Sequence, residues 1–272
     1  CTNLIKKKGI KRVFYSFNDT DKRTAYKSKK ILSKKKIGVK RILVNDFKDF
    51  YESYFVIQKK KIPFVDAKIA ISKDYFTIKK GSKWITNYLS RNRAHLLRSQ
   101  YDCILSTSKS INKDNSLLNC RLNGFDHDKP DLIIVDLKLK IKKRIDLFKF
   151  KKKRKIIIIT SNLKSKKISY LKKKGIKFIF IKSLKEKFDF ISLFKMLRKY
   201  GYNRILVESG LKFLNALIIH KLIFNLYVFQ SSKKLRTSGL NNSTINYIKK
   251  MNLKKKIKVN LNGDNLYKVK IK

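Results

Sequence analysis

The chain has 272 residues, 43% of them hydrophobic, and it contains only nine glycines and two prolines. This composition can fill the core of one large domain, or of one domain with part of a neighbour, and it excludes a disordered basic tail. No apolar stretch approaches the roughly 18 residues that a membrane-spanning helix needs, and no signal peptide is recognisable. We expect a globular, cytoplasmic protein, and we expect further residues upstream of Cys1 in the natural chain.

The formal net charge of +52 comes from 70 basic residues that are spread along almost the whole chain. Lys, Ile, Asn, Phe and Tyr are abundant together and share AT-rich codons, so a compositional drift of the genome explains the charge. A nucleic-acid binder instead gathers its basic residues in a patch, often with aromatic residues between them. We therefore expect no specific nucleic-acid partner. The three cysteines form no CxxC pair, which argues against a disulfide framework.

Residues 1–60 alternate between helical and strand patterns. We expect helices at Thr2–Lys8, Thr24–Lys36 and Asp46–Lys59, and strands at Arg12–Phe17 and Val39–Val44. Two strands joined by a helix in so short a segment predict a βαβ unit with parallel strands. The basic run Lys59–Lys61 before Pro63 predicts a linker to the next unit.

From Phe64 onward, short apolar strands alternate with helices. The expected strands are Phe64–Ser72, Cys103–Thr107, Leu132–Val135, Ile156–Thr160, Phe178–Ile181 and Ile205–Val207. The expected helices are one that Thr86 caps and that ends near Ser99, and then Leu163–Lys174, Phe190–Tyr200 and Leu214–His220. We expect antiparallel strands at Leu226–Phe229, Lys256–Leu261 and Leu266–Ile271. The alternation predicts an α/β domain with a mostly parallel sheet.

The strand that ends at Val207 leads into an acid, a glycine and a helix. Glu208 at the carboxyl end of a buried strand can accept hydrogen bonds from sugar hydroxyls. Gly210 lets the backbone approach a ligand, and the N-terminus of the following helix offers free N–H groups to an anion. The pattern therefore predicts a phosphate or sugar site, with an ordinary turn as the alternative.

A second group lies around Trp84, which is the only tryptophan of the chain. Its indole can cover a flat ligand ring, or it can fill the core. Arg91, His95 and Arg98 follow at helical spacing and share one face, which suits a ligand phosphate or a solvated basic face. A third group, Asp114, Leu118 and Arg121, falls in an expected loop after the strand 103–107. By themselves the acid and the arginine of this group are typical of a surface pair.

Taken together, these groups resemble the reductase domain of the bacterial riboflavin-biosynthesis deaminase/reductase family, over about residues 62–230. The matching positions are Lys68, Ala70, Ser72, Asp74, Ser82, Trp84, Ile85, Thr86, Arg91, His95, Leu97, Arg98, Gln100, Asp102, Ile104, Leu105, Asp114, Leu118, Arg121, Val207, Glu208 and Gly210. From Trp84 to Arg121 their spacing matches without a gap. The resemblance implies a dihydrofolate-reductase-like α/β fold, NADPH as the hydride donor, and a homodimer.

The resemblance also implies roles for individual residues. The positions that would bind the substrate are Ser82, Arg98, Leu118, Arg121 and Glu208. The positions that would bind NADPH are Ala70, Trp84, Ser110, Asp114, Gly210, Leu211, Lys212, Phe213, Leu214, Asn215 and Ala216. No residue is identified as the proton donor.

The chain departs from the family pattern at several of these places. Tyr75 follows Asp74 where the family usually has glycine, and Leu211-Lys212 replaces a usual Pro-Thr. Ser110 stands where Thr is commoner, and Gln230–Ser232 replaces a glycine-rich stretch. These departures affect the cofactor contacts more than the substrate contacts.

Residues 1–60 resemble the end of the zinc deaminase domain of the same family, and residues 61–272 would be the reductase domain. Cys1-Thr2 matches the end of a Pro-Pro-Cys-Thr segment, in which the cysteine is the last zinc ligand, although an arbitrary starting point is the alternative. The His-x-Glu motif and the other cysteine of this zinc site are absent from the chain. We expect zinc and deaminase activity in a full-length chain only.

The implied substrate is 5-amino-6-(5-phosphoribosylamino)uracil, whose opened ribose accepts a hydride at C1'. Arg98 and Arg121 would hold its phosphate, Glu208 its hydroxyl groups, and Trp84 would pack on the nicotinamide. Three alternatives stay open at this point. They are a stand-alone reductase that acts before deamination, a basic RNA-binding protein, and an inactive structural remnant.

Overall fold

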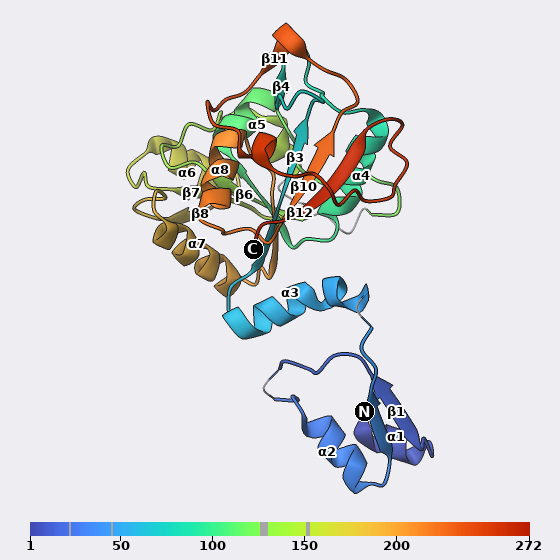
Figure 1. Ribbon diagram of the computed structural model, residues 1–272. Coiled ribbons are helices and arrows are strands. Elements are labelled where there is room, and N and C mark those ends of the chain that lie inside the picture. Colours follow the sequence, from blue (N-terminus) through green and yellow to red (C-terminus); the bar gives the residue numbers. More distant parts are fainter. Residues whose placement is uncertain (22, 45, 126–129, 151–152) are drawn as a thin grey trace. The chain divides into compact units, whose positions relative to one another are not determined.

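The computed structural model describes residues 1–21, 23–44, 46–125, 130–150 and 153–272. The chain divides into two compact units, Cys1–Ile62 and Pro63–Lys272, which are described separately (Figure 1). Among the described residues, no helix combines the length and the apolar character needed to cross a membrane.

The first unit is built around two parallel strands. Its elements are α1 (Thr2–Lys7), β1 (Arg12–Tyr15), α2 (Lys27–Lys34), β2 (Gly38–Arg41) and α3 (Asp46–Lys60). β1 and β2 pair in parallel, which confirms the predicted βαβ unit. The predicted linker is wrong at its start, because Lys59 and Lys60 form the last turn of α3. The helix ends at Lys60, because Lys61 adopts a left-handed φ of 51°, and Pro63 disfavours helical backbone at the residue before it.

The second unit contains an eight-stranded sheet in the order β12-β10-β3-β9-β5-β6-β7-β8. The strands are β3 (Phe64–Ile71), β5 (Cys103–Thr107), β6 (Asp131–Val135), β7 (Ile156–Thr160), β8 (Lys177–Phe180), β9 (Arg204–Val207), β10 (Asn225–Gln230) and β12 (Asn265–Lys270). All neighbouring strands are parallel except β12, which pairs antiparallel with β10 at the edge. The predicted α/β fold with a mostly parallel sheet is confirmed.

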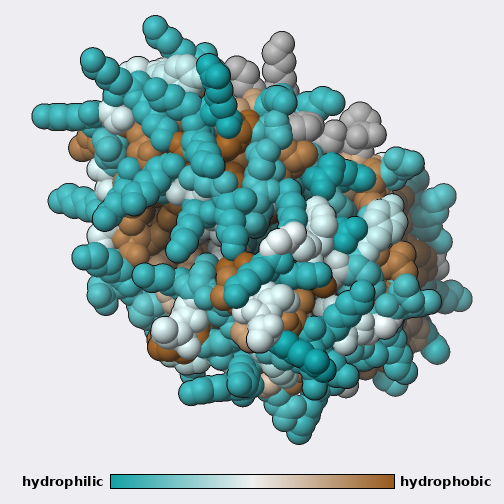
Figure 2. Space-filling view, turned by 90° about the horizontal axis from the view of Figure 1, so that it is seen from above, coloured by the Kyte–Doolittle hydropathy of each residue, from teal (hydrophilic) through white to brown (hydrophobic). Residues whose placement is uncertain are grey.

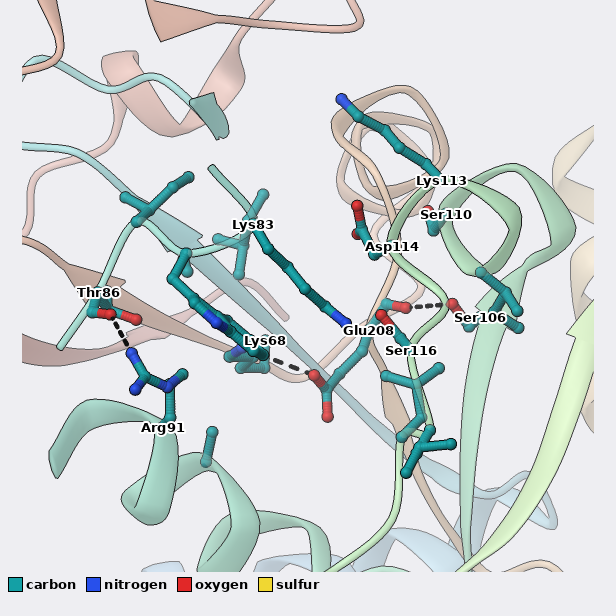
Figure 3. Close-up of a pocket in the computed structure, with 18 of the residues that line it drawn as sticks. Lys68, Lys83, Thr86, Arg91, Ser106, Ser110, Lys113, Asp114, Ser116 and Glu208 are labelled. Atoms are coloured by element: carbon teal, nitrogen blue, oxygen red, sulfur yellow. Dashed lines mark hydrogen bonds and ion pairs between the residues drawn. The ribbon is translucent and has the colours of Figure 1, made fainter. Parts of the chain in front are cut away.

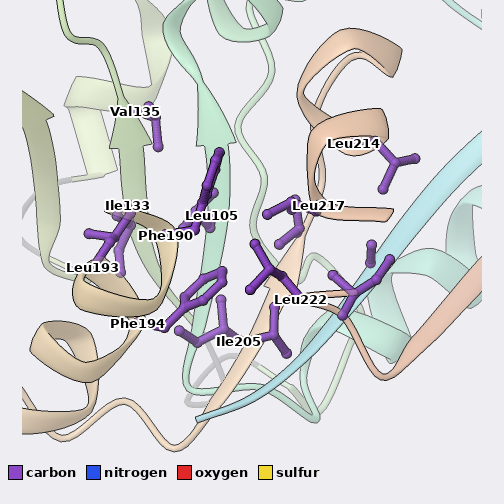
Figure 4. Packing of buried hydrophobic residues seen from close by; sticks show 14 of the residues in the cluster. Leu105, Ile133, Val135, Phe190, Leu193, Phe194, Ile205, Leu214, Leu217 and Leu222 are labelled. Carbon is purple, nitrogen blue, oxygen red and sulfur yellow. The ribbon is translucent and has the colours of Figure 1, made fainter. Parts of the chain in front are cut away.

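Helices cover both faces of this sheet, as parallel strands that are buried on both faces require. They are α4 (Tyr88–Arg98), α5 (Ser108–Asp114), α6 (Lys166–Lys173), α7 (Lys187–Lys199) and α8 (Leu211–Ile219). Residues of α7 and α8 pack with Leu105 and Ile133 on one face (Figure 4). Residues of α4, α5 and α6 pack with the alternate side chains Ile104 and Leu132 on the other face. Adjacent residues of one strand thus serve two separate cores.

The predicted antiparallel strands Leu226–Phe229 and Leu266–Ile271 are confirmed as β10 and β12, and β10 also pairs in parallel with β3. Two other predictions about elements are wrong. Lys256–Leu261 is not a strand, because its pairing is limited to one bridge between Lys256 and Tyr267. Thr86 does not cap α4. Asn87 does, because its side chain accepts a hydrogen bond from Ser90 N.

The sequence reading also missed several short elements. They are the two-stranded sheet of β4 (Ile78–Lys79) and β11 (Gly239–Leu240), the helix α5, and the 3₁₀ turns η1 (Asp146–Phe150), η2 (Arg236–Ser238) and η3 (Tyr247–Lys250). α5 begins because the Thr107 side chain accepts a hydrogen bond from Ser110 N, and Asn115 ends it in the left-handed region. Asp114 is therefore the last residue of a helix, and only Leu118 and Arg121 lie in the expected loop.

Hydrophilic side chains project over the whole face that Figure 2 shows, with hydrophobic ones scattered between them.

Candidate functional site

A large cavity opens where the central strands β3, β5 and β9 end. Carboxyl ends of neighbouring parallel strands share one edge of a sheet, so the side chains that follow them converge there. The cavity has a volume of about 1030 Å³. The predicted site residues that line it are Ala70, Ser82, Trp84, Arg98, Ser110, Asp114, Leu118, Arg121, Glu208, Gly210 and Leu211. The structure therefore brings together residues that are far apart in the sequence.

Glu208 lies in this cavity, and Figure 3 shows its carboxylate beside Lys68. Its Oε1 accepts a hydrogen bond from Arg98 Nε at 2.5 Å, and its Oε2 accepts one from Arg98 Nη2 at 3.0 Å. Lys68 Nζ lies 3.6 Å from the same Oε2. Burial raises the pKa of Glu208, but the charges of Arg98 and Lys68 outweigh this effect and bring the pKa to about 2. The carboxylate is therefore ionised at neutral pH.

Lys68 is the residue of this cluster to which the sequence reading gave no role. It is a basic residue inside the apolar strand β3, and its ammonium lies 5.5 Å from the centre of the Phe229 ring. Burial lowers the pKa of Lys68, and the charge of Glu208 opposes the shift. The sequence does contain one signal for Lys68, which is a lysine between apolar residues of a strand. A buried lysine needs a charged partner or a ligand, so this pattern indicates a site residue.

Each of the three nitrogens of the Arg98 guanidinium donates a hydrogen bond. Besides its two bonds to Glu208, it donates from Nη1 to the backbone oxygen of Asn119 at 3.2 Å. Only 11% of its side chain is exposed. The structure thus places Arg98 where it orients Glu208, and a direct contact with a ligand phosphate stays a prediction.

His95 lies between Arg98 and Arg121, and its ring is uncharged. Its Nδ1 lies 2.8 Å from the backbone oxygen of Asn119, which can only accept, so Nδ1 carries the proton. Its Nε2 then accepts from Arg121 Nη2 at 3.1 Å. Burial, together with the charges of Arg98 and Arg121, lowers the pKa of His95 to about 4. The neutral His95 therefore orients Arg121, whose Nη1 also donates a hydrogen bond to Asn119 Oδ1 at 2.6 Å.

The three residues of the predicted row, Arg91, His95 and Arg98, all line the cavity, but they have different partners. Arg91 donates to the backbone oxygen of Thr86, and its guanidinium carbon lies 4.8 Å from the centre of the Trp84 ring. Trp84 is 49% exposed, so it does not fill the core. The indole lines the cavity, where it is available to a flat ligand ring.

Gly210 begins α8 close to two side chains from other parts of the chain. Its N–H donates to Ser110 Oγ at 3.0 Å, which joins the ends of β5 and β9. A Cβ at this position would lie 2.5 Å from Asn242 Nδ2. A larger residue would therefore require the Asn242 side chain to shift, while the φ of −67° at Gly210 is ordinary. Asn242, which also lines the cavity, was missed because the sequence does not show this long-range contact.

Only the start of α8 faces the cavity. Lys212, Phe213, Leu214, Asn215 and Ala216, which the resemblance assigned to the cofactor, do not line it. A helix turns its successive side chains in different directions. Leu214 is buried in the core (Figure 4), and Asn215 donates to the backbone oxygen of Ile245 at 2.7 Å. Gly210 and Leu211 are the part of the predicted segment that the structure places at the site.

Two departures from the family pattern can be located in the structure. Tyr75, which stands where the family usually has glycine, adopts a φ of 67°, a left-handed conformation that favours glycine. Asn246 Nδ2 donates to the backbone oxygen of Tyr75 at 2.9 Å. Leu211, in place of proline, is fully buried.

Cys1 lies in the first unit and is exposed. Within the part of the chain that the structure describes, no group of three or more His, Cys, Asp or Glu residues could hold a metal ion. Cys1 as a zinc ligand stays a prediction for a longer chain.

The family model for the RibD C-terminal domain matches residues 63–235. The chain is 27% identical over 214 residues to the riboflavin biosynthesis protein RibD of Actinobacillus pleuropneumoniae, covering 77% of this chain and 56% of that protein. It is 28% identical over 165 residues to a 5-amino-6-(5-phosphoribosylamino)uracil reductase of Buchnera aphidicola, covering 57% of this chain and 77% of that protein. The chain thus spans little more than half of the first of these relatives.

Solved structures show the same fold. A deaminase/reductase from Thermotoga maritima superposes with a TM-score of 0.81 at 22% identity, covering all of this chain and 74% of that one. RibD from Acinetobacter baumannii superposes with a TM-score of 0.80 at 20% identity, covering 99% and 75%. At these identities the likeness establishes the fold alone.

Proposed function

Because the chain belongs to the RibD C-terminal domain family, we propose that residues 63–272 form an NADPH-dependent reductase of riboflavin biosynthesis. The substrate would be 5-amino-6-(5-phosphoribosylamino)uracil, and the product its ribitylamino form. The observation that carries the proposal is the cluster of Lys68, Glu208 and Arg98 at the bottom of the cavity. A carboxylate and an ammonium held 3.6 Å apart can bind a polyhydroxylated chain and deliver a proton to it.

NADPH fits one side of the cavity. Ser209 Oγ and Asn242 Oδ1 are buried there without a hydrogen-bond partner in the described chain, beside the N-terminus of α8. Such atoms and the free N–H groups of a helix start suit the hydroxyl and phosphate groups of a dinucleotide. Lys83, Lys109 and Lys113 line the same cavity and would balance its phosphate charge. Trp84 would pack against the nicotinamide, which when bound supplies the hydride.

The substrate would occupy the other side of the cavity. Arg121 is exposed to the cavity that it lines and is held in place by His95 and Asn119, so it would receive the ribose phosphate. Glu208 would accept hydrogen bonds from the hydroxyl groups of the opened sugar. Ser82 and Leu118 would contact the rest of the molecule, as the resemblance implies.

Lys68 would supply the proton of the reaction. Reduction of the opened imine adds a hydride to C1' and breaks the π bond to nitrogen, whose electron pair then takes a proton. The Lys68 ammonium is the proton donor of the central cluster, and Glu208 keeps it in place. Water would return the proton to Lys68 after each turnover. Lys68 would thus be the proton donor, which the sequence alone does not identify.

The test is steady-state reduction by the full chain, with wild type, Lys68→Met and the exposed Lys185→Met compared. The proposal predicts substrate-dependent NADPH oxidation in wild type and in the control. In Lys68→Met it predicts a kcat that is lower by about a hundredfold or more, because general acid catalysis contributes roughly that much. Inactive wild type, folded by circular dichroism, would contradict the reductase proposal. Full activity in Lys68→Met would contradict the role of Lys68 alone.

Residues 1–62 would be the C-terminal part of the zinc deaminase domain, with Cys1 as a zinc ligand in the longer protein. This proposal is supported by the βαβ unit that the segment forms and by the match of the whole chain to a deaminase/reductase structure. A homodimer of the reductase domain is part of the same proposal. Zinc analysis and sedimentation of a chain extended at its N-terminus would test both.

A further inference from the structure

The segment from Leu117 to Arg121 forms one wall of the cavity. Leu117, Leu118 and Arg121 all line it. The segment has no regular secondary structure, and Leu118 has a φ of 49°, which a residue with a side chain seldom adopts. Something outside the segment must therefore hold its backbone in this shape.

The backbone oxygens of this segment turn inward onto buried basic side chains. Asn119 O accepts from Arg98 and His95, as described above. The two preceding oxygens are bound by Arg154, which comes just before β7. Arg154 Nη1 donates to Leu118 O at 2.7 Å, and Arg154 Nη2 donates to Leu117 O. Nη1 also lies 3.4 Å from Pro130 O.

Arg154 is an unusual group to bury for stability alone. It is 6% exposed, and no acidic side chain forms an ion pair with it among the residues whose placement is described. Its Nε has no hydrogen-bond partner there either. Burying a charge outside an ion pair is costly, and the contacts that offset this cost are hydrogen bonds to the backbone oxygens of Leu117, Leu118 and Pro130. The arginine does not line the cavity, so it does not touch a ligand directly.

We propose that Arg154 is a positioning residue for the substrate side of the cavity. By binding Leu117 O and Leu118 O it fixes the strained turn that presents Leu118 and Arg121 to the substrate. The planar fork of a guanidinium suits this task, because it reaches two neighbouring oxygens from one side chain. The inference rests on the proposed function, in which Leu118 and Arg121 bind the substrate and the start of α8 binds NADPH.

Two variants test the inference. Arg154→Met keeps the length of the side chain and removes every donor, and Arg154→Lys keeps the charge but reaches one oxygen at a time. The exposed Arg144→Met is the matched control. Affinities for ribose 5-phosphate, as a probe of the substrate side, and for NADPH are measured separately by calorimetry on the full chain. The kinetic constants for both substrates and hydrogen exchange over 115–123 complete the comparison.

The proposal predicts that Arg154→Met binds ribose 5-phosphate on the order of tenfold to a hundredfold more weakly, because a small misplacement of binding groups has effects of this size. Its NADPH affinity should change less than about threefold, and exchange over 115–123 should rise. Arg154→Lys should fall between Arg154→Met and wild type, and Arg144→Met should equal wild type. If Arg154→Met does not fold, Arg154→Lys provides the test. The inference then predicts that Arg154→Lys loses more affinity for ribose 5-phosphate than for NADPH.

Equal losses of both affinities, or no loss of either, would overturn the inference and leave Arg154 a purely structural residue. Failure of the proposed function gives a different result. In that case wild type itself would bind neither ribose 5-phosphate nor NADPH.

Discussion

Glu208 receives two hydrogen bonds from Arg98 and the charge of Lys68, and this pairing decides what substitutions at these residues should do. The sequence suggested that Arg98 binds the ligand phosphate. In the structure its guanidinium binds Glu208 and Asn119, and Arg121 binds Asn119 and His95 at the same cavity. At the scale of the residue, Arg98 orients the carboxylate, and we propose that Arg121 binds the substrate phosphate.

Arg98→Ala should therefore act on both binding and stability. Substrate affinity should fall about ten- to a hundredfold, and NADPH affinity much less, because Glu208 and Arg121 serve the substrate side. The free energy of unfolding should fall by about 3 to 5 kcal/mol, since the substitution leaves Glu208 buried without its main partner. Titration with each ligand and urea denaturation measure these effects, with Arg93→Ala on the same helix as the control. Equal losses for both ligands would show that Arg98 does not belong to the substrate side.

The ionisation of Glu208 gives a prediction about pH. Its pKa in the folded protein is about 2, below its ordinary value of 4.5, so folding stabilises the charged form. This contribution is complete above about pH 4.5 and is lost as the pH falls through 2, where the protonated form takes over. The stability difference between wild type and Glu208→Gln should therefore shrink by about 2 to 3 kcal/mol between about pH 5 and pH 2. A difference that stays constant over this range would contradict the ion pair.

At the scale of the element, the sequence predicted long apolar strands well and polar elements poorly. β5 and β7 were predicted to the residue, because a run such as Ile156–Thr160 has one satisfactory place in a sheet that is buried on both faces. α5 was missed, since its sequence SKSINKD has no apolar periodicity and its start depends on the Thr107 side chain. Lys256–Leu261 alternates like a strand, yet only a single bridge pairs it.

The site shows the same division. Many residues that line the cavity could be predicted, because the resemblance carried their spacing. Lys68, Asn119, Arg154 and Asn242 could not, because their roles depend on contacts between residues that are far apart in the chain. Arg154, for example, binds backbone oxygens 36 and 37 residues away, and no sequence pattern encodes a backbone oxygen.

The start of α8 gives a prediction at this scale. NADPH at a hundredfold excess over its Kd should stabilise wild type by about 2.7 kcal/mol, as mass action on a folded-state site requires. Gly210→Val should lose most of this shift, because its side chain would collide with Asn242 and enter the space of the cofactor. The double variant Gly210→Ala with Asn242→Ala should recover part of the shift, since the colliding amide is gone. Thermal unfolding with and without NADPH measures all three proteins, and an unchanged shift in Gly210→Val would contradict a cofactor site at α8.

At the scale of the whole molecule, the charge of +52 and the specific site act differently. Scattered surface lysines attract any anion, and salt screens this attraction over about 8 Å at 0.15 M. The cavity holds its charges in fixed, buried pairs such as Glu208 and Arg98, which salt screens much less. Neutralising exposed lysines should therefore change weak RNA binding and leave reduction almost unaffected.

We propose above all that this chain transfers a hydride from NADPH to C1' of a phosphoribosylaminopyrimidine. The most direct measurement follows the hydrogen itself, with NADPH that carries deuterium at the transferable position of C4 and mass spectrometry of the product. We predict one deuterium per product molecule, located at C1' of the ribityl chain, and its loss in Lys68→Met together with the activity. Oxidation of NADPH without deuterium at C1', or no turnover by correctly folded wild type, would contradict the account.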